Sequence, residues 1–103
     1  MTHLLRFVQR FEPSHRQEFL DLERRFVELE RDDPRLPKGK RYLASLGREP
    51  QNTLIWECEF ASLPGALEGA AAFDAHPRHD ELFALQVPYI IESYAEVYEE
   101  FDF

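Results

Sequence analysis

The sequence is poor in several residue types, and each shortage excludes a class of protein. It has one cysteine, Cys58, in 103 residues, which excludes an intrachain disulfide and a zinc site built on cysteines. It has 12 Lys and Arg against 20 Asp and Glu, a net charge of -8, which argues against binding to nucleic acid or to an anionic membrane. Its four glycines are dispersed and form no phosphate-binding loop.

Long apolar runs are also missing. No stretch approaches the roughly 20 apolar residues that span a bilayer, and the N-terminal residues lack the apolar run of a signal peptide. We therefore expect no membrane partner and a location in the cytoplasm.

The sequence does contain enough apolar material for a folded core. Hydrophobic residues make up 44% of the chain and aromatic residues 14%, too many for a disordered segment. The length of 103 residues predicts a single domain over residues 1–103. A chain this short buries only about 60–70% of its unfolded surface, so association with a second copy is a common way to bury more.

Apolar periodicity predicts the secondary structure. Alternation predicts four strands, over residues 3–11, 41–46, 53–60 and 90–101. On the first strand, Gln9 is the one polar residue of an otherwise apolar face.

Two helical segments separate these strands. Apolar residues three and four apart predict a helix over residues 15–31, with the stripe Phe19, Leu22, Phe26 and Leu29. Ser14 and Gln17 have the spacing of a capping box at its start, and its other faces carry charges that include Glu23 and Glu30. A second helix follows Ser62, is interrupted at His76-Pro77 and ends near Pro88.

The order β-α-β-β-α-β predicts an α+β, ferredoxin-like fold. Two helices would cover one face of a four-stranded antiparallel sheet with strand order 4-1-3-2. The helix-facing side would hold Leu5, Phe7, Trp56, Cys58, Ile91 and Val97.

The opposite face mixes paired charges with large apolar groups. It would carry Arg6, Arg10, Glu57, Glu59 and Tyr94, with Ile90 and other apolar residues between them. Such a mixture is typical of a protein interface, and we expect a homodimer through this face. A solvated face with scattered apolar residues is the alternative.

One stretch of the chain, residues 56–83, has the pattern of a known family. A strand that ends in an aromatic residue, at 56–60, leads into Ser62-Leu63-Pro64-Gly65-Ala66-Leu67. A small-residue helix, then His76-Pro77-Arg78-His79 and Phe83, follow. On this pattern and the order of its elements, the whole chain resembles the dimeric α/β-barrel superfamily, in its antibiotic-biosynthesis-monooxygenase-like and NIPSNAP-like branches.

The resemblance implies an assembly and a range of activities. In that superfamily two ferredoxin-like subunits place their sheets face to face and form a barrel with the helices outside. Members include cofactor-free oxygenases, haem-degrading enzymes, isomerases and proteins of unknown role. The haem-degrading members use an asparagine, a tryptophan and a histidine where this chain offers Gln9, Phe60 and Phe83, so the resemblance implies no cofactor here.

His76 and His79 are the candidate catalytic residues. They lie three apart on or beside a helix, and a histidine pair at that spacing can exchange protons or bind a metal. No third ligand is evident, so no metal is predicted. The alternative is that both are exposed residues at a helix break, where His79 or Asp80 caps the second segment.

Trp56, Tyr89, Tyr42 and Arg41 are candidates for ligand binding. Trp56 would line a pocket between sheet and helices, where its indole N–H needs a partner. The tyrosines could offer hydroxyls to an aromatic substrate, and Arg41 could meet an anion. Surface tyrosines and a surface ion pair are the alternatives. Cys58 shares the face of Trp56, where apolar surroundings would make it an inert core residue.

Two functions fit these features. The first is a small-metabolite enzyme of the cofactor-free oxygenase-like or isomerase-like kind, with a mainly apolar pocket and a histidine that carries the proton. The second is a non-catalytic ligand-binding or stress-related dimeric domain with the same pocket. In either case the partner would be a small apolar or aromatic molecule.

Overall fold

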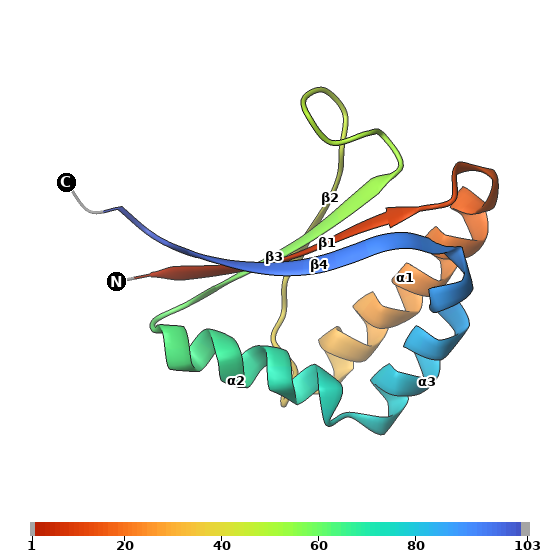
Figure 1. The fold of residues 1–103 in the computed structure, drawn as a ribbon. Coiled ribbons are helices and arrows are strands. Elements are labelled where there is room, and N and C mark those ends of the chain that lie inside the picture. The colour runs from red at the N-terminus through yellow and green to blue at the C-terminus, as the bar shows by residue number, and fades with distance from the viewer. Residues whose placement is uncertain (1, 102–103) are drawn as a thin grey trace.

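The computed structural model of the protein describes residues 2–101, so Met1, Asp102 and Phe103 lie outside it. Along the chain (Figure 1) come β1 (His3–Phe11), α1 (Arg16–Asp32), β2 (Lys40–Leu43), β3 (Thr53–Phe60), α2 (Leu63–Asp74), α3 (Pro77–Gln86) and β4 (Ile90–Glu99). All strand pairs are antiparallel, in the order β2-β3-β1-β4. This confirms the predicted ferredoxin-like sheet.

The three helices lie on one face of the sheet, and the connection between β2 and β3 projects from the other (Figure 1). We call these the covered face and the open face. None of the helices within residues 2–101 is long and apolar enough to cross a membrane.

The helix starts follow from local chemistry, with one difference from the prediction. Ser62 caps α2, because its hydroxyl accepts a hydrogen bond from the Gly65 N–H at 3.0 Å. Ser14 does not cap α1, as it lies in a 3₁₀ turn (Pro13–His15) that precedes the first helical residue, Arg16. The helix therefore starts one residue later than predicted, with His15 rather than Ser14 at the N-cap position.

The interruption at His76-Pro77 divides the second helical segment into α2 and α3. His76 is the N-cap of α3, and its Nδ1 accepts hydrogen bonds from the N–H groups of Arg78 at 3.2 Å and His79 at 3.4 Å. The proline at the first position of α3 has no N–H to leave unpaired. The break lets α3 turn away from α2 and pack beside α1.

A β-bulge on β4 overturns one prediction about the core. Arg10 pairs with Glu92 and Phe11 pairs with Ile90, so Ile91 is the extra residue between them. Ile90 therefore packs beside the buried Phe11, whereas Ile91 is 44% exposed. The predicted positions of Ile90 on the open face and Ile91 in the core were wrong, because the bulge shifts the alternation by one residue.

The open face carries ion pairs in the predicted cross-strand positions. Arg6 lies between Glu57 at 3.0 Å and Glu96 at 3.8 Å, and we call these three residues the open-face triad. The β2–β3 connection leans over the same face, where the Tyr94 hydroxyl lies 3.3 Å from a carboxylate oxygen of Glu49.

Candidate functional site

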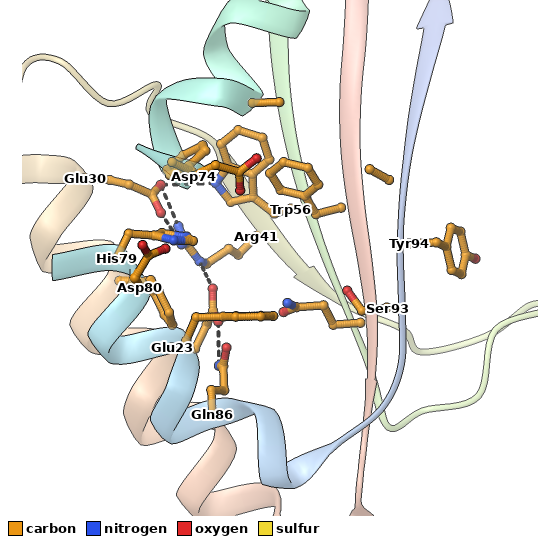
Figure 2. Close-up of a pocket in the computed structure, with 17 residues that line it drawn as sticks. Glu23, Glu30, Arg41, Trp56, Asp74, His79, Asp80, Gln86, Ser93 and Tyr94 are labelled. Carbon is orange, nitrogen blue, oxygen red and sulfur yellow. Dashed lines mark hydrogen bonds and ion pairs between the residues drawn. The ribbon is translucent and has the colours of Figure 1, made fainter. Parts of the chain in front are cut away.

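A cavity of about 410 Å³ lies between the covered face of the sheet and the helices (Figure 2). This volume falls in the range of small-molecule sites. Ser93 and Ala95 of β4 line the cavity and are exposed, as are Asp74 at the end of α2 and Asp80 in the first turn of α3. The cavity therefore opens to solvent between β4 and the junction of α2 with α3.

One side of the cavity is lined by a connected group of aromatic rings, which we call the aromatic wall: Phe7, Phe26, Trp56, Phe73, His79 and Phe83. Phe7 stacks on Trp56 with ring centroids 5.0 Å apart, and Phe73 meets Trp56 edge-on at 5.4 Å. Such arrangements add stability beyond the burial of area. They hold the rings in fixed orientations around the cavity.

A buried ion cluster forms the polar part of the lining. The Arg41 guanidinium lies between two carboxylates of α1 (Figure 2): its Nε donates to Glu23 at 2.6 Å and its Nη1 to Glu30 at 3.1 Å, and its Nη2 also donates to Glu30. We call these residues the buried triad. Burial alone would lower the pKa of Arg41, but hydrogen bonding to Glu30 and the charge of Glu23 raise it instead.

Two further side chains complete this cluster. The Trp56 indole N–H donates to Glu30 at 3.1 Å, and the Gln86 amide donates to Glu23 at 2.9 Å. Both carboxylates thus accept hydrogen bonds from several directions, as buried charges require. The indole partner predicted for Trp56 is a residue of the protein itself.

The buried triad corrects two predictions. Glu23 and Glu30 were placed on solvated faces of α1, but as whole residues they are only 8% and 5% exposed. Arg41 was expected in a surface ion pair or free to bind an anion, yet its guanidinium is buried and already bonded to both carboxylates. The reason lies in the register of β2, where Arg41 pairs with Trp56 and so faces the helices. Its charge draws in the two glutamates that lie seven residues apart on one side of α1.

His79 lines the cavity from the first turn of α3. Its ring lies 5.0 Å from that of Phe26 and 5.1 Å from that of Phe73, and it stacks on Phe83 at 6.3 Å. The imidazole is therefore part of the aromatic wall, with apolar rings on three sides.

These surroundings set the charge of His79. Burial lowers the pKa of His79, and the nearby carboxylates of Asp80 and Asp74 offset only part of this effect. The imidazole is thus neutral at pH 7, with one nitrogen able to accept a proton.

His76 lies outside the cavity lining, although it is only three residues from His79. Its Nε2 is 2.7 Å from Asp33, just past the end of α1, while its Nδ1 caps α3. Bonds from Arg35 and from His76 lower the pKa of Asp33. Among residues 2–101, no three His, Cys, Asp or Glu side chains are grouped to hold a metal ion.

The remaining candidates lie in three other places. Tyr89 packs on the ring of His15 at 5.1 Å and is absent from the cavity lining. Tyr42 is 49% exposed on the open face, opposite Ile55. Cys58 packs against the core cluster around Trp56, and burial raises its pKa. The structure therefore brings together Trp56, Arg41 and His79 but not Tyr42, Tyr89 or His76.

Three uncharged polar residues of the cavity were not singled out from the sequence as site residues: Gln9, Gln86 and Ser93. Within residues 2–101, no hydrogen bond involves the side chains of Gln9 or Ser93, which face each other across β1 and β4. Gln9 did carry a usable signal, because it interrupts an otherwise apolar strand face. Gln86 and Ser93 carried none.

Fold and cavity together define a ferredoxin-like α+β domain with a pocket between sheet and helices. A NIPSNAP family protein from Agrobacterium tumefaciens has the same fold, with a TM-score of 0.79 and 17% identity over 99% of this chain and 88% of that one. A NIPSNAP-like domain protein from Burkholderia xenovorans has a TM-score of 0.78 and 17% identity, over 99% of this chain and 87% of that one. A putative antibiotic biosynthesis monooxygenase from Nitrosomonas europaea has a TM-score of 0.72 and 8% identity, over 96% of this chain and 89% of that one.

These similarities confirm the predicted resemblance at the level of the fold. No protein-family model matches the sequence, and no curated protein matches it. What the cavity does must therefore be argued from its own residues.

Proposed function

We propose that this chain is a small-molecule enzyme that binds an apolar or aromatic metabolite in the cavity and uses His79 to accept a proton from it. The observation that carries the proposal is the imidazole of His79 set in an aromatic wall, facing a cavity of about 410 Å³, where burial lowers its pKa. A base whose pKa lies near or below the working pH is unprotonated and ready to act. Of the two candidate histidines, only His79 lines this cavity.

Removal of a proton from the substrate can begin either an isomerisation or an oxygenation. Return of the proton to a different atom of the substrate would be an isomerisation. Reaction of the resulting anion with dioxygen would be an oxygenation, in keeping with solved proteins of this fold described as a putative monooxygenase and as a possible oxidoreductase. Gln9 and Ser93, whose polar groups are free within residues 2–101, would orient the substrate.

The test separates the two histidines. The protein is incubated in deuterium oxide with a panel of small hydroxylated aromatic compounds, and deuterium incorporation and dioxygen uptake are followed by NMR and an oxygen electrode. We expect His79→Ala to lower the rate at least about 100-fold, the usual contribution of a general base. His76→Asn is the matched control, because it removes the second imidazole but retains a side-chain acceptor to cap α3, and it should retain the rate within a few-fold. Undiminished turnover in His79→Ala would overturn the proposed role.

One observation favours the second candidate, a binding domain without catalysis. The Arg41 guanidinium, the indole N–H of Trp56 and the Gln86 amide all bond to Glu23 or Glu30. Few polar groups are left to stabilise charge that develops on a substrate. In this case a compound of the panel would shift cavity resonances in the NMR spectrum, while neither deuterium exchange nor dioxygen uptake would occur.

We also propose that the open face pairs with a second copy of the chain. Arg6 and Arg10 of β1 lie beside glutamates of β3 and β4, so the face offers charges of both signs to a second copy. Tyr42, Tyr94 and Tyr98 add exposed aromatic surface there. Native mass spectrometry should show twice the mass of 12.2 kDa.

A pair of charge reversals tests this assembly. Arg10→Glu places a second acidic group beside Glu92 on the open face, and we expect it to weaken the dimer at least about tenfold. Arg24→Glu makes the same change on the exposed side of α1 and should leave the dimer unchanged. A monomer for the unaltered protein, or equal effects of the two variants, would overturn the proposed interface.

A further inference from the structure

The charges around the cavity are unbalanced. Its lining contains four carboxylates and one guanidinium, a formal charge of -3 with His79 neutral. Arg41 cannot attract an anionic ligand, because Glu23 and Glu30 already surround it. The potential in the cavity is therefore negative, which opposes the entry of an anion.

Two of the carboxylates lie at the mouth. Asp74 is the last residue of α2 and Asp80 lies in the first turn of α3, on either side of the helix break, and Figure 2 shows both among the labelled side chains of the lining. Neither side chain forms an ion pair or accepts a hydrogen bond within residues 2–101. Both are exposed, so they can bind an incoming group without breaking an existing contact.

The aromatic wall supplies the second requirement for a cation. Ring faces carry negative charge density, and a cation within about 6 Å of a ring centroid is attracted to them. The ring centroid of Phe73 lies 5.4 Å from that of Trp56 and 5.1 Å from that of His79, so these three rings lie side by side in the lining of the cavity. Aromatic rings next to unpaired carboxylates are the combination that recognises ammonium groups.

We propose that the cavity binds an organic cation, a small aromatic or aliphatic body that carries a protonated or quaternary amine. The apolar body would lie against the aromatic wall, and the ammonium group would lie near Asp74 and Asp80. This inference rests on the proposed function, since it names the ligand class of the same cavity. The inference goes beyond the proposed function in requiring a positive charge on the ligand, because the aromatic wall alone would accept a neutral ring equally well.

Three probes with one ring and different charges test the inference. Benzylamine, which is protonated at pH 7.5, benzyl alcohol and benzoate are titrated separately into the ¹⁵N-labelled protein, and binding is followed by amide shifts in α2 and α3. We expect the dissociation constant of benzylamine to be about tenfold below that of benzyl alcohol, and benzoate to bind most weakly.

Isosteric variants then identify the source of the preference. Asp74→Asn combined with Asp80→Asn should raise the dissociation constant of benzylamine to that of benzyl alcohol and leave benzyl alcohol unaffected. Glu81→Gln and Glu68→Gln together form the matched control, because these exposed residues lie on the same two helices, carry the same charge and do not line the cavity. The control pair should preserve at least half of the preference for benzylamine.

The outcomes separate this inference from the proposed function. Equal or tighter binding of benzyl alcohol or benzoate in the cavity would overturn the inference and leave a small-molecule pocket in place. A preference that survives in the double aspartate variant would also overturn it. If none of the three probes shifts the amides of the cavity lining, the pocket itself, and with it the proposed function, is wrong.

Discussion

The two faces of the sheet contain the same group of charges in different surroundings. The buried triad and the open-face triad each place one arginine between two glutamates. The glutamate side chains are 7% and 10% exposed in the buried triad, against 27% and 37% in the open-face triad. The comparison teaches that the number of ion pairs says little about stability, because burial decides the penalty for breaking one.

The largest expected effect comes from removing each arginine in turn. Arg41→Met leaves two buried carboxylates without a cation and should lower the free energy of unfolding by about 3–5 kcal/mol. Arg6→Met leaves two partly solvated carboxylates and should lower it by about 1 kcal/mol or less. Chemical denaturation of both variants measures the difference. Equal losses would remove the distinction between the faces, and a loss for Arg6→Met that shrinks on dilution would indicate that a second copy covers it.

A second experiment asks whether the penalty is one of unpaired charge. Combining Arg41→Met with Glu23→Gln and Glu30→Gln removes all three charges but retains acceptors for Trp56 and Gln86. We expect the triple variant to recover at least about 2 kcal/mol relative to Arg41→Met, because neutral groups are cheaper to bury. No recovery in the same denaturation assay would mean that the shape of the arginine, rather than its charge, matters.

The space around two glycines, Gly39 and Gly47, differs between the two faces as the burial of charge does. A Cβ atom at Gly39 would overlap the Trp56 indole, so Gly39→Ala should cost about 1–3 kcal/mol and displace the indole from Glu30. Gly47, in the β2–β3 connection, has a φ of 143° and nothing within 4 Å of such an atom. Gly47→Ala should therefore cost only its backbone strain, about 1 kcal/mol, and should leave tryptophan fluorescence unchanged. Indistinguishable fluorescence in the two variants would contradict this account.

The smallest effect concerns pH and the covered face. Burial lowers the pKa of His79 below the ordinary value of 6.5, so in acid the unfolded chain binds the proton more readily than the folded one. The free energy of unfolding should therefore fall as the pH drops below about 6.5, by at most about 1.4 kcal/mol per pH unit. Urea denaturation at pH 7.5 and 5.5 measures this slope, which should be shallower in His79→Phe. Equal slopes in the two proteins would contradict a buried neutral imidazole.

Much of the fold could be predicted from the sequence because local patterns determine it. Period-two alternation located β1 and β3 to the residue, and Pro77 marked the division between α2 and α3. The error at Ile90 and Ile91 arose because a bulge depends on how two strands meet, which the sequence of one strand does not contain.

The site was only partly predictable for a similar reason. Trp56 and His79 belong to residue types that are typical of pockets, and both line the cavity. The glutamates of the buried triad looked like ordinary solvated positions of α1, because nothing within that helix shows that Arg41 will face it from another element. Tyr42 and Tyr89 were chosen for their hydroxyls alone, and residue type does not determine which way a side chain points.

The bulge at Ile91 also bears on how this chain should be aligned with distant relatives. After the bulge the core-facing positions of β4 are odd-numbered, whereas before it the core-facing position is Ile90. A relative without the bulge would have one residue fewer here and an unbroken alternation. At identities near 17%, an alignment without a gap would match core residues to surface residues over part of the strand. A single-residue gap at Ile91 would restore the match, so apparent divergence in this strand would partly measure one insertion rather than many substitutions.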